Sequence, residues 1–168
     1  NGDGVYDALV DKQFIGYTRP RYRLGLRNDF TFLKDFTATI FLRADLGHQR
    51  EFTYATHESS TYDRINIMNI PYWTPTNGET EYARTSEVHG AYGGGLRVFK
   101  PTGFLRVQDV SLSYNIPSYI AEKLQTKSIR VFVSARNLAT FTNWPGYDPE
   151  SGNVPIPKSF SAGINLSL

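Results

Sequence analysis

The chain has 168 residues, a formal net charge of +2 and no cysteine. This length suits one ordinary domain with a core, and the small charge provides no broad basic field for nucleic acid. The lack of cysteine excludes disulfide scaffolds, thiolate metal sites and cysteine nucleophiles. Aromatic residues are dense, with 11 Tyr, 11 Phe and 2 Trp, and this composition is typical of β-structure.

Alternation of apolar and polar residues, with Asn28 and Phe41 as exceptions, predicts the first two strands, over about 22–32 and 36–45. In "YRLGLRNDFTF" the Tyr, Leu and Phe residues share one face, and the Arg, Asp and Thr residues share the other. The run "FTATIFLRAD" repeats the pattern after a short Leu33–Asp35 turn. The two runs therefore form a tight antiparallel hairpin.

A long segment from about 46 to 102 then loses the alternation. It is rich in Gly, Asn, Thr, Pro and aromatic residues, as in "NIPYWTPTNGETEYAR". Connections inside compact domains are rarely this long. The segment therefore carries function or packs against something outside this chain.

Alternation returns in three further strands, expected at about 104–114, 129–137 and 160–168. Leu105 and Val107 are out of phase with the later apolar residues of their strand, which predicts a bulge near Gln108 or Asp109. "PSYIAEKLQ" reads as a short helix, and a second polar loop spans about 139–158.

Five strands with one apolar and one polar face fit two architectures. A secreted β-sandwich would bury the apolar faces against each other, and it would bind glycans through loop aromatics and carry a structural calcium loop. A transmembrane barrel would turn the apolar faces to lipid and the polar faces to a wet lumen. The strand lengths and the sorting of short and long connections to opposite ends favour the barrel. Because five strands cannot close a pore, the barrel interpretation requires the chain to be part of a larger barrel.

Three blocks in chain order carry a family resemblance: "GFLRVQDVSLSYNIPSYIAEKL", "SIRVFVSARNLATFTNWPGYDPE" and "PIPKSFSAGINLSL". Together they resemble the C-terminal end of SusC/RagA-type TonB-dependent outer-membrane transporters. Upstream, "YWTPTNGETEYAR" resembles an extracellular stretch of that family, and the opening "NGDGVYD" resembles its "DvNGDGvID". The resemblance covers essentially the whole chain, and the "NLATFTNWPGYDPE" block is its most specific part.

The resemblance implies an all-β fold in which residues 1–168 form the last five antiparallel strands of a barrel of about 22 strands. It also implies long extracellular loops and one short periplasmic helix. The expected function is import of oligosaccharides or peptides across the bacterial outer membrane, energised by the TonB complex. The expected partners are a SusD-like lipoprotein, the N-terminal barrel and plug portion of the same transporter, membrane lipid and lipopolysaccharide. No enzyme activity and no required cofactor are expected, because no catalytic constellation is visible.

The opening "NGDGVYD" also suggests a structural calcium ion bound within residues 1–11. Calcium prefers several hard oxygen ligands, and alternating acidic and amide residues around a glycine supply them. The alternative is an Asn/Asp/Gly turn that caps itself, since the first ligand and a closing bidentate Glu are missing. The candidate ligands are Asn1, Asp3, Val5, Asp7 and Asp11.

Aromatic residues in the two long loops are candidates for contact with the solute or with the lipoprotein lid. Aromatic faces beside Asn and Asp suit stacking on sugar rings or gripping peptides, although exposed aromatics also mark interfaces or loop packing. The candidates are Tyr72, Trp73, Trp144 and Tyr147. Arginines on the polar faces of the strands are expected to contact the plug or to line the solute path. They are Arg23, Arg27, Arg43, Arg130 and Arg136.

Overall fold

A computed structural model describes residues 7, 10, 12–55, 68–82, 97–152 and 154–168. The chain divides into two compact units, which are described separately. The sheet unit comprises Arg19–Gly47 and Thr102–Leu168, and the loop unit comprises Asn1–Thr18 and His48–Pro101. No helix in these described ranges is long and apolar enough to cross a membrane.

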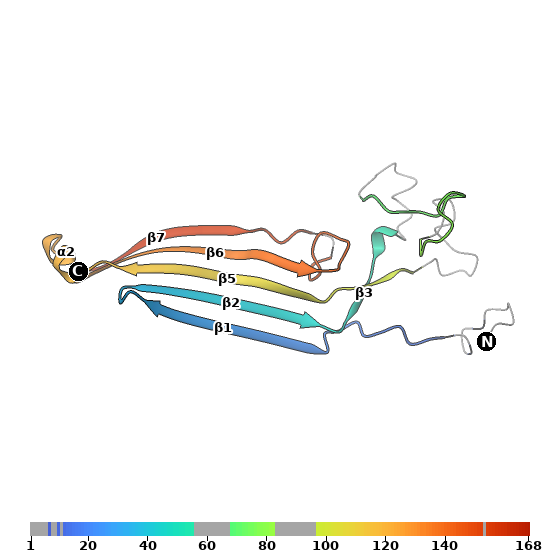
Figure 1. The fold of residues 1–168 in the computed structure, drawn as a ribbon, viewed down its shortest axis with the longest axis horizontal. Coiled ribbons are helices and arrows are strands. Elements are labelled where there is room, and N and C mark those ends of the chain that lie inside the picture. The colour runs from blue at the N-terminus through green and yellow to red at the C-terminus, as the bar shows by residue number, and fades with distance from the viewer. Residues whose placement is uncertain (1–6, 8–9, 11, 56–67, 83–96, 153) are drawn as a thin grey trace. The chain divides into compact units, whose positions relative to one another are not determined.

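The sheet unit contains one five-stranded antiparallel sheet in the order β1-β2-β5-β6-β7 (Figure 1). The strands are β1 Tyr22–Phe32, β2 Phe36–Leu46, β5 Phe104–Asn115, β6 Ser128–Thr142 and β7 Ser159–Ser167. The five-stranded antiparallel sheet expected from the alternation is confirmed. β6 runs five residues beyond its predicted end at 137, and the last four of them come from the predicted polar loop.

Two short connections lie at one end of the sheet, which we call the turn end. The β1–β2 hairpin turns at Leu33 and Lys34, whose φ angles of 49° and 67° are those of a two-residue hairpin turn. The helix α2, Ser118–Lys123, lies between β5 and β6. It ends where Thr126 donates both its backbone N–H and its hydroxyl to the Ala121 carbonyl, at 3.0 Å each. The opposite end, which carries the β6–β7 connection, is the loop end.

The predicted bulge is present in β5. The register shifts between Val107 and Asp109 opposite β6, and opposite β2 it shifts at Phe41 and Leu42. Gln108 is thus the extra residue, and it brings Arg106 and Asp109 onto the same face although they are three positions apart. Because the bulge changes the face to which the side chains of β5 point, it determines which side chains lie together at the loop end.

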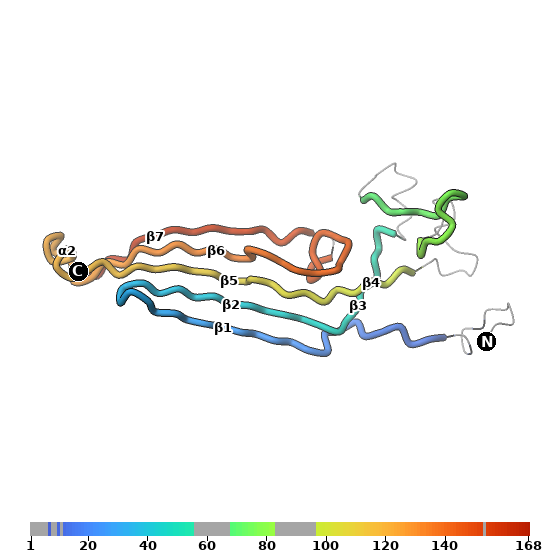
Figure 2. The backbone as a smooth tube through the Cα atoms, viewed as in Figure 1, coloured from blue at the N-terminus to red at the C-terminus, as the bar shows by residue number. Residues whose placement is uncertain are grey.

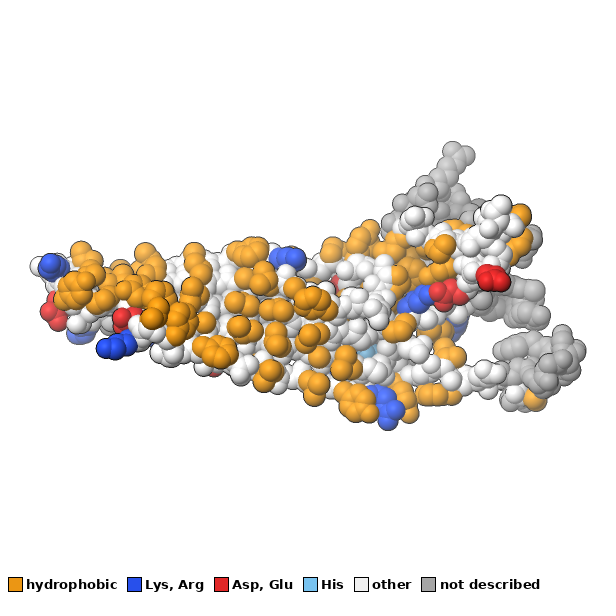
Figure 3. Space-filling model, viewed as in Figure 1, with side chains coloured by type: hydrophobic (Ala, Val, Ile, Leu, Met, Phe, Trp, Pro, Cys, Tyr) orange, Lys and Arg blue, Asp and Glu red, His pale blue; other side chains and the backbone are white. Residues whose placement is uncertain are grey.

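The sheet has an apolar face and a polar face, because successive side chains point to opposite sides of a strand. The register aligns apolar residues of all five strands in rows, such as Phe30, Ala38, Leu112, Val133 and Ala162. Many of these side chains are exposed, among them Val133 at 53%. Figure 3 shows hydrophobic side chains spread along the strands on the face in view. The continuous path of each strand can be followed in Figure 2.

Two phenylalanines of the polar face lie against glycines of neighbouring strands. Phe132 is paired with Gly163, and a Cβ added to Gly163 would lie 2.7 Å from the Phe132 ring. Phe41 lies over Gly25 at a looser 3.5 Å. The absence of a side chain at each glycine therefore leaves room for the two rings.

The loop unit contains a second, smaller sheet that the sequence pattern did not predict. β3, Gln49–Glu51, pairs antiparallel with β4, Phe99–Pro101, and the 3-10 helix η1 spans Thr53–Ala55. Phe52 is buried and donates its backbone N–H to Val98 at 2.7 Å. These strands have only three residues each, too few for an alternating pattern to be recognised.

Candidate functional site

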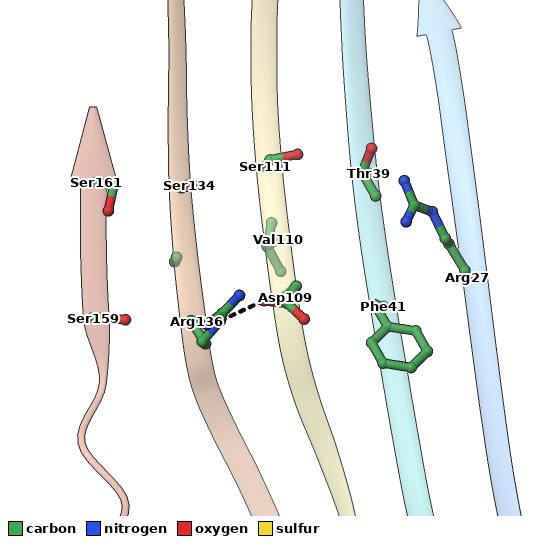
Figure 4. A pocket seen from close by; sticks show the side chains of 11 residues that line it. Arg27, Thr39, Phe41, Asp109, Val110, Ser111, Ser134, Arg136, Ser159 and Ser161 are labelled. Atoms are coloured by element: carbon green, nitrogen blue, oxygen red, sulfur yellow. Dashed lines mark hydrogen bonds and ion pairs between the residues drawn. The ribbon is translucent and has the colours of Figure 1, made fainter. Parts of the chain in front are cut away.

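The middle of the polar face is hollowed into a depression of about 630 Å³ (Figure 4). All five strands contribute to it, so its shape depends on the register described above. Its lining residues are Arg27, Thr39, Phe41, Asp109, Val110, Ser111, Ser134, Ala135, Arg136, Ser159 and Ser161.

A row of hydroxyl groups crosses the hollow. Thr39, Ser111, Ser134 and Ser161 are successive partners in the register of β2, β5, β6 and β7. Each hydroxyl can donate one hydrogen bond and accept others. The row can therefore both donate hydrogen bonds to a polar solute and accept hydrogen bonds from it.

Two exposed arginine–aspartate pairs flank the hydroxyl row. Arg136 Nε donates to Asp109 Oδ1 at 3.0 Å, as the dashed line in Figure 4 marks. Arg27 Nε donates to Asp29 Oδ2 at 3.1 Å, and Asp29 also accepts from the Thr39 hydroxyl. Water reaches both arginines, and the Arg136 side chain is 68% exposed. The hollow is thus polar and contains charged groups of both signs, so that its net charge is close to zero.

A third arginine on the same face, Arg106, is buried. Its side chain is only 3% exposed and forms three polar contacts. Nη2 donates to Asp148 Oδ2 at 2.7 Å, Nη1 to Glu150 Oε2 at 2.9 Å, and Nε to the Thr140 hydroxyl at 3.1 Å. A buried charge is tolerated only when it is paired and hydrogen-bonded, and Arg106 meets both conditions.

Arg43 of β2 extends this network. It donates to Glu150 Oε1 at 2.8 Å and to the buried Asp45 at 3.0 Å. The Phe104 ring lies beneath the two guanidinium groups, 5.5 Å from Arg43 and 4.9 Å from Arg106. We call these groups the Arg106 latch, which comprises Arg43, Asp45, Phe104, Arg106, Asp148 and Glu150.

Asp148 also organises the β6–β7 loop from within. Its Oδ1 accepts the backbone N–H groups of Glu150 at 2.9 Å and Ser151 at 3.2 Å. Its carbonyl accepts the N–H of Gly152 at 2.7 Å, and Gly152 has the positive φ of 82° that glycine adopts without strain. One carboxylate therefore shapes the loop with one oxygen and holds Arg106 with the other.

Sequence reasoning missed the Arg106 latch. Arg106, Asp148 and Glu150 were not among the predicted site residues, although the last two stand in the "GYDPE" motif that carries the family resemblance. The available signal was the bulge, because an extra residue at Gln108 moves Arg106 onto the face that already holds Arg43.

The predicted loop aromatics lie in both units. Trp144 is 6% exposed, and its ring packs so closely on Gly146 that a Cβ there would lie 2.3 Å from Nε1. Tyr147 is 53% exposed in the same loop. Tyr72 and Trp73 are half-buried in the loop unit, where Asn77 donates to the Tyr72 carbonyl at 3.2 Å. Burial favours loop packing for Trp144, and contact with a solute or lid stays a prediction for the other three.

The candidate calcium ligands Asn1, Asp3, Val5 and Asp11 lie outside the described residues. Asp7 is described and exposed, and its carbonyl accepts the backbone N–H of Val10 at 3.1 Å. Within the described ranges, no group of three or more His, Cys, Asp or Glu side chains is placed to hold a metal ion. The calcium interpretation stays a prediction.

Comparison with known proteins found no matching family model. The chain is 27% identical over 96% of its length to TonB-dependent receptor P3 of Formosa agariphila. It is 24% identical over 91% of its length to TonB-dependent receptor P39 of the same organism. It spans 18% and 15% of the lengths of these two curated relatives.

The fold is similar to solved structures of the RagAB peptide importer. In the open-open state the TM-score is 0.71 with 23% identity, over 98% of this chain and 19% of that chain. In the closed-closed state the TM-score is 0.58 with 20% identity, over 79% of this chain and 16% of that chain. The chain is thus similar in sequence to TonB-dependent receptors, and its five-stranded antiparallel sheet shares the fold of part of the RagAB peptide importer.

Proposed function

We propose that the chain forms part of the wall of an outer-membrane transporter that imports peptides or oligosaccharides. The observation that carries this proposal is the two-faced sheet, whose apolar side chains are exposed on one side and whose other side is a polar hollow. Lipid would cover the apolar face, and the polar face would line the solute path. In this arrangement the hydroxyl row and the exposed arginines offer passing solutes weak, reversible hydrogen bonds.

Strand length and aromatic placement support the membrane assignment. The strands have 9 to 15 residues, and a tilted membrane strand needs roughly 9–11. At the turn end, Phe36 stacks on Phe32 with ring centroids 5.5 Å apart and on Tyr114 at 4.5 Å. Aromatic girdles lie at both membrane–water interfaces of barrels, and short turns are typical of the periplasmic side. Together these features support assigning the turn end to the periplasm.

The open edges of the sheet support the need for further barrel strands. In the described sheet β1 and β7 each have one strand neighbour. Unpaired backbone groups cannot face lipid, so the N-terminal barrel portion of the transporter would pair with these edges. A plug within that barrel, a SusD-like lipoprotein and the TonB complex are the further partners that we propose, on the basis of the family relationship.

The alternative, a secreted β-sandwich that binds glycans, has less support. A sandwich needs a second sheet of similar size to cover the apolar face. The only other sheet in the described ranges has two strands of three residues each. It is too small for that role.

The test is uptake by cells that carry the complete transporter. We expect that deleting the gene abolishes uptake of one fluorescent solute class, peptide or oligosaccharide, and that the restored gene recovers it. Uptake should also stop when the proton-motive force is collapsed, because energy through TonB depends on it. Unchanged uptake of both solute classes in the deletion strain would refute the proposed function.

A further inference from the structure

The β6–β7 loop folds back across the polar face instead of continuing along its own strands. It joins β6 to β7, yet Glu150 reaches Arg43 on β2, and Asp148 reaches Arg106 on β5. In the sheet order, β2 lies two strands away from β6. Neighbouring strands are about 4.8 Å apart, so the loop reaches back about 10 Å over the sheet.

The covering loop explains an unequal burial of arginines on this face. Arg106 and Arg136 point to the same side and each pairs with aspartate. Arg136, near the hollow, is 68% exposed, whereas Arg106, whose partners are loop acids, is 3% exposed. Asp45 and Phe104 of the same network are also buried. A loop held over these residues occupies space at the loop end of the polar face.

Arg106 has a geometry that lysine cannot reproduce. Its guanidinium directs separate N–H groups to Asp148, Glu150 and Thr140. Arginine presents such donors in a rigid planar fork, whereas lysine is a compact point charge on a flexible stem. Arg106 therefore attracts the acidic side chains of the loop by its charge, and its directed hydrogen bonds also fix the position of the loop.

We propose that the Arg106 latch makes the β6–β7 loop a fixed wall of the solute path and that Arg106 is the positioning residue of that wall. This inference rests on the proposed transport function. Through the latch, Tyr147 is presented from a fixed backbone at the loop end, where it contacts peptide or oligosaccharide solutes. Arg106 itself is too buried to touch the solute.

The first readout is loop mobility, which does not depend on transport. This chain has no cysteine, so Tyr147→Cys provides one spin-label site within it. In the full-length transporter we expect the label to be restrained with Arg106 present and mobile in R106M. R106K should be intermediate, because lysine restores the charge without the fork. K127M, which removes an exposed charge at the turn end, is the matched control and should leave the label restrained.

The second readout is uptake by the unlabelled variants. R106M should raise the half-saturating solute concentration about tenfold, the size of one lost positioned contact, while the maximal rate stays close to wild type. A label that stays restrained in folded R106M would overturn the latch. A mobile label with unchanged half-saturation would overturn the loop's role as a wall. If wild-type cells show no uptake, the proposed function fails, and the mobility result still decides the latch.

Discussion

Val133→Arg is expected to destabilise the full-length protein by roughly 2–4 kcal/mol, the cost of a basic side chain facing lipid near the membrane centre. Val133 lies in the middle of β6 on the apolar face and is 53% exposed, so little protein covers it. Ser134→Arg, one residue along, should cost much less. Its side chain points to the polar face and would be hydrated in the hollow.

The comparison uses the full-length protein refolded in lipid vesicles and unfolded with urea. The two variants introduce the same side chain into adjacent positions of one strand, which makes them matched controls for size and charge. If Ser134→Arg proved the more damaging, the assignment of the two faces would be inverted.

Arg106→Met is expected to release the β6–β7 loop. The free energy required to open the loop should fall by about 3–5 kcal/mol. The substitution leaves Asp148 Oδ2 buried without its guanidinium partner. Opening the loop relieves this cost because it returns the carboxylate to water, so the effect should be local. The strands of the sheet should keep their stability.

Amide hydrogen exchange measures this opening directly. The N–H of Gly152 is bonded to the Asp148 carbonyl, and its exchange should accelerate by at least about a hundredfold, since each 1.4 kcal/mol is tenfold. R136M removes the same charge from an exposed pair, which is worth about 1 kcal/mol or less, and should leave Gly152 unchanged. Equal exchange in the two variants would contradict the latch.

The sheet was predictable because a half-exposed strand repeats with a period of two residues, which a single sequence displays. The bulge was predictable for the same reason, since Leu105 and Val107 break phase with Val110. The predicted end of β6 at 137 was wrong because Asn137, which has a φ of 54°, interrupts the alternation of apolar and polar residues. Alternation resumes beyond it, where Phe141 pairs with Leu105 and Thr140 with Arg106.

The Arg106 latch was not predictable from periodicity because it joins residues that are distant in the sequence. Glu150 and Arg43 are 107 positions apart. Alternation assigns a side chain to a face, but it does not indicate which loop folds over that face. The burial of Arg106 depends on that loop, so only the three-dimensional structure revealed it.

The central claim is that lipid covers the apolar face of the sheet and water reaches the polar face. A spin-label scan of β6 from Val131 to Arg136, in the full-length protein in a bilayer, tests it most directly. Labels at Val131, Val133 and Ala135 should respond to lipid-soluble oxygen. Labels at Phe132, Ser134 and Arg136 should respond less to oxygen than their neighbours. A scan without this alternation, or one in which a water-soluble nickel complex reaches the apolar set, would contradict the account.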